Sequence, residues 1–279
     1  MPFLIIRPLK PLSFRWGGEF SPALSGPMNR GVSEPLPLPS TVTGFLYSIT
    51  KGGGKEVRGG LSLEEDLRTV GSKVWGPLLR VGDDYYAHSY PGRLIRVTGW
   101  RLGEEVSVGA VLAVVNRIGI GLRFDTKNAM EHMIYSQQLV KVRDGGIVVE
   151  VGVDVKEGYY TMGGEGGLVR VEPIHDVRPP DSGDEGLVLS PVIMAPRDGV
   201  RSVEDLYDME VEGCGRLGDI AVSVKVGLIG LGFNLTHNVR RPIYPAIMPG
   251  SRLRCNRRGN IGLFRDYGWG SVLPVAVPK

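Results

Sequence analysis

The sequence predicts an α+β fold of two units, each an antiparallel sheet backed by helices. A strand, a helix, further strands, a helix and a strand follow one another, and a similar series comes next. The 279 residues include 41 glycines and 20 prolines, which favour many turns and short strands. Because 42% of the residues are hydrophobic and 23% are charged, the chain can bury a core. We place the boundary between the units near residue 145, giving residues 1–145 and 146–279.

The first unit begins with a short apolar strand over residues 3–7, closed by Pro8. A helix follows from Ser40, which we expect to be its N-cap. Apolar residues then recur at helical spacing and predict one buried face: Val42, Phe45, Leu46 and Ile49. A capping box from Ser62 to Glu65 predicts a further short helix over 62–71.

The rest of the first unit combines strands with one more helix. Residues 94–102 and 106–115 are rich in β-branched side chains and predict strands. Residues 125–140 predict a helix, because four side chains recur at helical spacing: Met130, Met133, Ile134 and Gln137.

The periodicity changes in the second unit. Residues 147–155 alternate, with valines on one face and charged residues on the other, and predict a half-exposed strand. The stretch "GGEGGLVRVEP" predicts a turn, through Gly163, Gly164 and Glu165, that leads into another strand. A polar loop over 175–185, a short helix over 202–209 and an alternating strand over 219–235 complete the expected order.

Cysteine usage and hydropathy limit the class of protein. Cys214 and Cys255 lie far apart in the sequence, so we expect no disulfide framework and no Cys-x-x-Cys zinc site. We expect no metal and no cofactor. The N-terminus "MPFLIIRPLKPL" has no secretory apolar run, and Lys225 interrupts the most apolar stretch. We therefore expect a cytoplasmic protein without a membrane span. A scarcity of glutamine is a weak indication of a thermophilic source.

Charge is distributed unevenly along the chain. Residues 1–143 carry a net charge of +6, residues 144–215 carry −11, and residues 237–279 carry +7. The basic residues are 24 arginines and 9 lysines, and arginine is the side chain that best binds phosphate and stacks on bases. We expect the basic C-terminal segment to face a polyanion and the acidic middle segment to face protein partners or solvent.

Common catalytic motifs are absent from the sequence. "GGGKE" lacks the first glycine and the Ser/Thr of a P-loop, and Gly119-x-Gly121 lacks the third glycine of a dinucleotide fingerprint. His132 lies three residues before Tyr135, so on a helix the two would share a face and could cleave RNA by general acid–base catalysis. No third group lies beside them in the sequence, and His132 could equally be an ordinary surface residue.

The C-terminal segment is the strongest candidate site. Arginines can bind phosphates, aromatic rings can stack on unpaired bases, and glycines let the backbone approach a sugar-phosphate chain. A Gly-rich hairpin with a buried aromatic core and solvated arginines remains the alternative. The arginines concerned are Arg240, Arg241, Arg252, Arg254, Arg257, Arg258 and Arg265, and the aromatic residues are Tyr244, Phe264, Tyr267 and Trp269.

Six stretches, in order and covering nearly the full length, resemble the third subunit of the Cmr complex, the type III-B CRISPR effector, in the RAMP superfamily. They are "PLSFRWGGEF", "PLPLPSTVTGFLYSI", "RIGIGLRFDTKNAMEHMIYSQQLVKV", "GGEGGLVRVEP", "IMPGSRLR" and "GNIGLFRDYGWGSV". Trp16 stands where this family usually carries an acidic residue, and the chain is short for the family. The resemblance implies two ferredoxin-like (RRM-like) RAMP units.

The resemblance also implies a function and a set of RNA-binding residues. It implies a non-catalytic scaffold subunit that binds the 5′ tag of the guide RNA (crRNA) and joins the Cas10-type large subunit to the backbone RAMP subunit. Gly268, Trp269 and Gly270 resemble the family's C-terminal Gly-rich loop, which lies along the guide RNA. The remaining residues that we expect beside RNA are Arg15, Trp16, Gly17, Gly18, Ser40, Thr41, Arg240, Arg241, Arg252, Arg254, Arg257 and Arg258.

Two other functions stay open at the level of sequence. Some relatives are RAMP endoribonucleases that process precursor guide RNA, but the helix "STVTGFLYSI" carries no histidine and His132 lacks a clear partner. A purely protein-binding adaptor would leave the basic segment 237–279 unexplained. The scaffold is therefore the leading interpretation.

Overall fold

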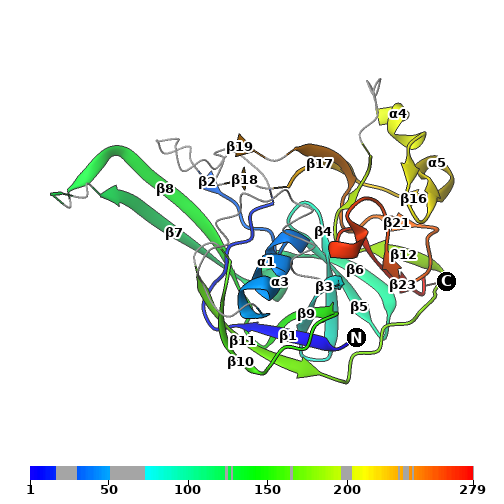
Figure 1. Ribbon diagram of the computed structural model, residues 1–279, viewed down its shortest axis with the longest axis horizontal. Coiled ribbons are helices and arrows are strands. Elements are labelled where there is room, and N and C mark those ends of the chain that lie inside the picture. Colours follow the sequence, from blue (N-terminus) through cyan, green and yellow to red (C-terminus); the bar gives the residue numbers. More distant parts are fainter. Residues whose placement is uncertain are drawn as a thin grey trace.

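The computed structural model describes residues 1–16, 30–50, 73–122, 125–126, 128–163, 166–195, 203–231, 233–234, 239–240 and 242–278. These residues form mostly antiparallel sheets with four short α-helices (Figure 1). None of the helices among them is both long and apolar enough to cross a membrane. The predicted helix over 62–71 lies outside the described residues, as do Gly17, Gly18 and Arg241.

An eight-stranded antiparallel sheet forms the centre of the molecule. The first strand, β1, lies inside this sheet between β9 and β11. The strands, in spatial order, are β10 (Gly158–Met162), β11 (Gly167–Ile174), β1 (Phe3–Pro8), β9 (Gly145–Val151), β3 (Val74–Val81), β4 (Asp84–Ser89), β5 (Arg93–Thr98) and β6 (Arg101–Ser107).

Both faces of the central sheet are covered. Leu4 and Ile6 of β1 point into a core shared with helix α1 (Pro39–Thr50), whereas Phe3 and Ile5 point into a second core on the opposite face. Strands β12 (Glu185–Val188) and β23 (Ser271–Val275) supply apolar side chains to that second core. Residues 3–6 of β1 are therefore all apolar, because neither of their faces meets water.

The remaining elements form smaller sheets around this centre. β12 and β23 belong to a five-stranded sheet with β16 (Ala221–Ser223), β21 (Arg252–Leu253) and β22 (Gly259–Asn260). A three-stranded sheet contains β13 (Val192–Ile193), β20 (Ile243–Ile247) and β17 (Val226–Gly230), and another contains β2 (Arg30–Gly31), β8 (Ala129–Lys141) and β7 (Ala113–Leu122). Two further sheets have two strands each. One pairs β14 (Glu210–Val211) with β15 (Gly215–Arg216), and the other pairs β18 (Phe233–Asn234) with β19 (Val239–Arg240). Helices α3 (Val108–Val111), α4 (Val203–Tyr207) and α5 (Leu217–Ile220) and the 3₁₀ turn η1 (Arg265–Tyr267) connect them.

The predictions of β1 and α1 are confirmed, but the N-cap of α1 was wrong. The helix begins at Pro39, and the carbonyl of Leu38 accepts the N–H groups of Thr41 at 2.9 Å and of Val42 at 3.2 Å. Proline suits the first helical position because that position needs no N–H donor. Ser40 therefore lies within the first turn of the helix.

The helix predicted over residues 125–140 was wrong. This segment contains β8, whose long antiparallel ladder with β7 runs from the pair Ala113 and Lys141 to the pair Leu122 and Ala129. In Figure 1 the two strands form an arm that projects from the body. The strand predicted over 106–115 is also interrupted, because α3 separates β6 from β7.

The second half of the chain contributes to the central sheet. Strands β9 to β11 follow the predicted boundary near residue 145, yet they pair with β1 and β3, which precede it. β9 ends at Val151, and its residues 146–151 are buried on both faces instead of one as the alternation predicted. The division into two ferredoxin-like units stays a prediction. The predictions of β11, of the loop after it and of α4 are confirmed.

The sequence predicted no disulfide framework, but it did not predict that the two cysteines form a single bond. Cys214 and Cys255 form a disulfide with a Cα–Cα separation of 5.8 Å across 41 residues of sequence. Among the described residues, no group of three or more His, Cys, Asp or Glu side chains is placed to hold a metal ion.

Candidate nucleic-acid interface

The C-terminal Gly-rich loop packs against the first turn of α1. Gly268 has a φ of 90°, and a Cβ there would lie 3.0 Å from the Cβ of Val74. Thr43 Oγ1 of α1 donates to the carbonyl of Tyr267 at 3.4 Å. Glycine is needed at position 268 because the backbone is left-handed and lies close to β3. The structure therefore brings the predicted loop beside the predicted helix turn that carries Ser40 and Thr41.

The backbone donors of this loop are already used inside the protein. The N–H of Gly270 donates to the carbonyl of Pro191 at 2.9 Å, and that of Gly268 donates to the carbonyl of Arg265 at 3.3 Å. Ser190 Oγ donates to the carbonyl of Gly268 at 2.8 Å. The loop is thus a fixed structural turn, and its glycine N–H groups are not turned toward a phosphate.

Trp269 is a core residue. Its side chain is 0% exposed and packs in the core between the central sheet and α1. Of the two roles that the sequence left open for this residue, packing is the one that the structure shows. The indole contributes to stability and holds the loop in place, because a fully buried ring cannot stack on a base.

A cavity of about 480 Å³ opens beside the loop. Its wall carries basic, acidic and aromatic side chains together, and it lies between the start of β3, the end of β9 and the residues around β22. The lining residues are Met1, Lys73, Val74, Trp75, Glu150, Asp181, Gly213, Arg258, Gly259, Asn260, Arg265 and Asp266.

Arg258 forms part of this wall. Its guanidinium carbon lies 4.7 Å from the ring centre of Trp75 and 5.4 Å from that of Phe3. The same group makes an ion pair with Glu150, and the two side chains are only 19% and 10% exposed. Arginine suits this place because it can stack on aromatic rings while it pairs with a carboxylate. Arg258 is thus held inside the protein.

Several other C-terminal arginines also contact acidic residues. Arg252 lies 3.5 Å from Glu185, and Arg265 lies 3.1 Å from Glu212. Glu150, Glu185 and Glu212 all belong to the acidic segment 144–215. The expectation that this segment and the basic C-terminal segment form separate faces was therefore wrong, because the fold places their charges side by side.

Arg254 and Arg257 remain at the surface. Arg254 donates to the carbonyl of Asp219 at 3.1 Å, and its side chain is exposed. The Arg257 side chain is also exposed, and no carboxylate partner for it is found among the described residues. The backbone of Arg240 lies in β19. Among the predicted arginines of the described C-terminal segment, Arg257 is the one best placed to meet a ligand.

Trp16 is buried, whereas Arg15 is exposed. Trp16 Nε1 donates to the carbonyl of Leu36 at 2.7 Å, and its ring meets the His88 ring edge-on at 4.4 Å between centres. A base cannot reach this indole while it is packed in the core. Of the described residues predicted in this loop, only Arg15 can face a bound strand.

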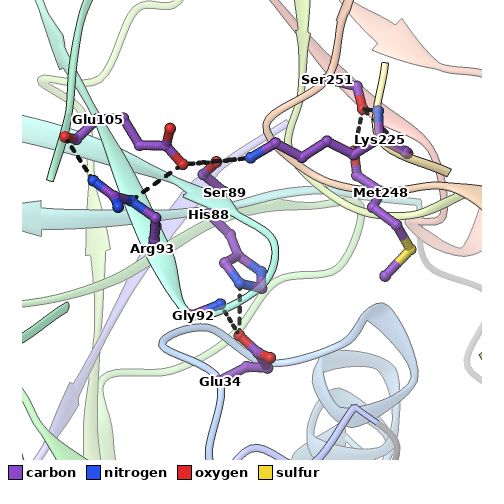
Figure 2. Close-up of polar contacts among 9 residues, drawn as sticks. All are labelled: Glu34, His88, Ser89, Gly92, Arg93, Glu105, Lys225, Met248 and Ser251. Atoms are coloured by element: carbon purple, nitrogen blue, oxygen red, sulfur yellow. Dashed lines mark hydrogen bonds and ion pairs between the residues drawn. The ribbon is translucent and has the colours of Figure 1, made fainter. Parts of the chain in front are cut away.

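A polar network joins the His88 environment to the C-terminal part of the chain (Figure 2). His88 Nε2 lies 2.9 Å from Glu34 Oε2, and the same oxygen accepts the N–H of Gly92 at 2.9 Å. Burial lowers the pKa of His88 and outweighs the opposing effect of Glu34, with a smaller lowering by Lys225. The imidazole is fully buried and stays neutral, so His88 is a structural residue.

Lys225 reaches this network from the segment before β17. Its Nζ donates to Ser89 Oγ at 2.6 Å and lies 3.4 Å from Glu105, while Ser89 Oγ donates to Glu105 at 2.6 Å (Figure 2). The hydrogen bond from Ser89 lowers the pKa of Glu105, and Lys225 lowers it further against the effect of burial. The network therefore connects β4 and β6 to the sheet that contains β17 and β20.

The arm of β7 and β8 is a surface that the sequence pattern missed. Ile118 and Ile120 of β7 are 73% and 52% exposed, and Arg117, which directly precedes them, is exposed as well. The alternation of "RIGIGL" over residues 117–122 could have revealed the second half of this strand, because apolar and polar or glycine residues follow one another there with a period of two. An exposed apolar strand flanked by arginine is a typical interaction surface.

The comparisons with known proteins agree with the resemblance found in the motifs. No family model matches the chain. A curated relative, the CRISPR system CMR subunit Cmr3 of Saccharolobus solfataricus, is 24% identical over 282 residues, covering 90% of this chain and 85% of the relative.

Two solved structures share the fold. A chain in the cryo-EM structure of the type III-B Cmr-beta complex bound to cognate target RNA matches with a TM-score of 0.68 at 20% identity, covering 99% of each chain. A chain in the same complex bound to cognate target RNA and AMPPnP matches with a TM-score of 0.62 at 20% identity, covering 90% of this chain and 85% of the other. The resemblance to the third Cmr subunit is confirmed.

Proposed function

We propose that this chain is a guide-RNA-binding scaffold subunit of a type III-B CRISPR effector complex. Its similarity to Cmr3 along 90% of the chain is the observation that carries the proposal. In this role the chain binds the 5′ tag of the guide RNA and joins a Cas10-type large subunit to the backbone RAMP subunit. The shared fold of the Cmr-beta chains supports the same assignment.

Exposed arginines and the arm are the surfaces that fit RNA and protein partners. Arg15, Arg117 and Arg257 are exposed, and arginine binds phosphate with its planar fork of donors. The exposed isoleucines of β7 suit an apolar contact with a neighbouring subunit or with bases. The buried tryptophans give the loops a fixed shape and do not contact the RNA themselves.

We further propose that the chain binds RNA without cleaving it. His88 is fully buried and neutral, so it cannot exchange a proton with a bound strand. His132 and Tyr135 lie in β8. The helix on which their spacing would have put them on one face is not formed. The acid–base pair considered for an RNA-processing enzyme therefore lacks its geometric basis.

The test is binding of a guide RNA by the purified chain. A fluorescent guide RNA with its native 5′ tag is compared with one whose tag is scrambled, by fluorescence anisotropy at several salt concentrations. We expect tighter binding of the native tag and an intact RNA after prolonged incubation with divalent metal. Equal affinity for both RNAs would exclude tag recognition by this chain, and specific cleavage would favour the endoribonuclease.

Assembly is tested separately with the large subunit and the backbone subunit. Size-exclusion chromatography of the three purified proteins should give a ternary complex only when this chain is present. A binary complex of the other two that forms equally well without it would contradict the joining role.

A further inference from the structure

The Cys214–Cys255 disulfide closes a small hairpin onto the body of the protein. Cys214 lies in the turn between β14 and β15, and Cys255 follows β21. Their Cα–Cα separation of 5.8 Å is ordinary for a disulfide. The bond thus connects two segments of the second half that belong to different sheets.

The base and the tip of this hairpin are held differently. At the base, Met209, Val211 and Leu217 are buried in a core with β12, β21 and β23 side chains. The ladder of β14 and β15 has only two residue pairs, and so short a hairpin has little stability of its own. The tip, residues 212–214, therefore depends on its attachments to the rest of the chain.

Besides the disulfide, the structure shows two attachments at the tip, and both involve Glu212. Its carbonyl accepts the N–H of Gly262 at 2.7 Å, and its carboxylate lies 3.1 Å from Arg265. The ion pair is solvent-exposed, with side chains 42% and 55% exposed, so it adds little stability. The disulfide is consequently the strongest link that holds the tip in place.

The position of the tip matters for the cavity beside the Gly-rich loop. Gly213 lines that cavity together with Arg265, and a Cβ on Gly213 would lie 3.2 Å from Arg265 Nη1. Both cysteine residues are partly exposed, so a soluble thiol can approach the bond. A chemical change at the disulfide can therefore alter one wall of the cavity.

We propose that the Cys214–Cys255 disulfide is a reversible redox site that controls the hairpin tip. A dithiol reductant attacks one sulfur as a thiolate, forms a mixed disulfide and then closes its own ring. The reductant is oxidised to a cyclic disulfide, and the protein disulfide gains two electrons and two protons to become two thiols. Once reduced, the tip opens more often, and Glu212 releases Arg265 and the adjoining cavity wall.

Hydrogen exchange of the backbone amides of residues 210–216 tests this proposal. The air-oxidised protein is compared with the protein reduced by dithiothreitol and with the double variant Cys214→Ser/Cys255→Ser. We expect reduction to speed exchange in this segment about tenfold, while β12 and β23 keep their protection. The double variant should exchange like the reduced protein and should not respond to dithiothreitol.

Thiol titration provides the chemical control. The unfolded oxidised protein should show no free thiol, and the reduced protein should show two, because these are the only cysteines in the sequence. The variant Glu212→Gln, which keeps the disulfide, should change exchange at the tip much less than reduction does. Unchanged exchange after complete reduction, or two free thiols after mild oxidation, would overturn the proposal.

Discussion

Arg258 and Glu150 form an ion pair inside the protein, across 108 residues of sequence. Glu150 lies on the central strand β9, and Arg258 lies just before β22 in the segment with the highest positive charge. Two aromatic rings, of Trp75 and Phe3, lie under the guanidinium. This arginine therefore joins the C-terminal segment to the central sheet.

Replacing Arg258 by alanine should destabilise the protein. The change leaves the Glu150 carboxylate largely buried without its partner, and removal of one member of a buried ion pair typically costs about 3–5 kcal/mol. We expect a value near the lower end because the Arg258 side chain is still 19% exposed. Urea unfolding at pH 7 measures the change in the free energy of unfolding.

Arg257→Ala is the matched control for stability, and Glu150→Gln tests the pair from its other side. The Arg257 side chain is exposed, so this variant should change the free energy of unfolding by less than about 0.5 kcal/mol. In the background of Arg258→Ala, Glu150→Gln should restore part of the lost stability because it removes the unpaired charge. Equal stabilities of the two arginine variants would contradict the structural role of Arg258.

For RNA binding we expect the opposite order of effects, with the change at Arg257 affecting affinity more than the change at Arg258. If Arg257 contacts a phosphate of a single strand, Arg257→Ala reduces the slope of log affinity against log salt by about 0.7. Arg258→Gln removes a positive charge that is held inside the protein by Glu150, so it should leave that slope unchanged. Anisotropy titrations at four salt concentrations separate the two variants. A flatter slope for Arg258→Gln alone would place the RNA at the cavity instead.

Trp269→Ala should lower the free energy of unfolding of the protein without removing a contact with an RNA base. Deleting a fully buried aromatic side chain costs about 3–5 kcal/mol, and Trp269→Phe should cost less because it leaves a smaller void. Thermal unfolding measures both changes. At a temperature where the folded state still predominates, RNA affinity of the phenylalanine variant should equal that of the unmodified protein. A loss of affinity with no loss of melting temperature would mean that the indole reaches the RNA.

The sequence predicted β1 and α1 correctly from short local patterns. These were the apolar run of β1 and the helical spacing of Val42, Phe45 and Leu46, the face that α1 buries against the central sheet. The segment of β8 was mispredicted because its apolar spacing also fits a helix. Its long pairing with β7 decided the outcome, and such a ladder depends on contacts that a single segment does not contain.

Two predicted parts of the candidate site lie together, but their contacts could not be predicted. The Gly-rich loop and the first turn of α1 were each expected beside RNA, and the structure places them next to each other. In the sequence, residues 237–279 carry a net charge of +7, and Asp266 is their only acidic residue. Glu150, Glu185 and Glu212 come from distant strands and turns, so only the folded chain shows that they pair with these arginines.

Stability should fall in mildly acidic solution because of His88. Burial holds the pKa of His88 below its usual value of 6.5, although Glu34 acts in the opposite direction. Between that lowered pKa and 6.5 the unfolded chain binds more protons than the folded protein. The buried neutral imidazole therefore costs no stability above pH 6.5. As the pH falls below 6.5, the free energy of unfolding decreases by up to about 1.4 kcal/mol per pH unit.

The variant His88→Gln isolates this contribution. Glutamine can still donate to Glu34 but does not titrate, so the difference in the free energy of unfolding between the unmodified protein and His88→Gln should decrease from pH 7 to pH 5. Of the charged groups that affect His88, Glu34 and Lys225 stay in place in both proteins. A constant difference between the unmodified protein and His88→Gln across this range would mean that folding does not lower the pKa of the imidazole.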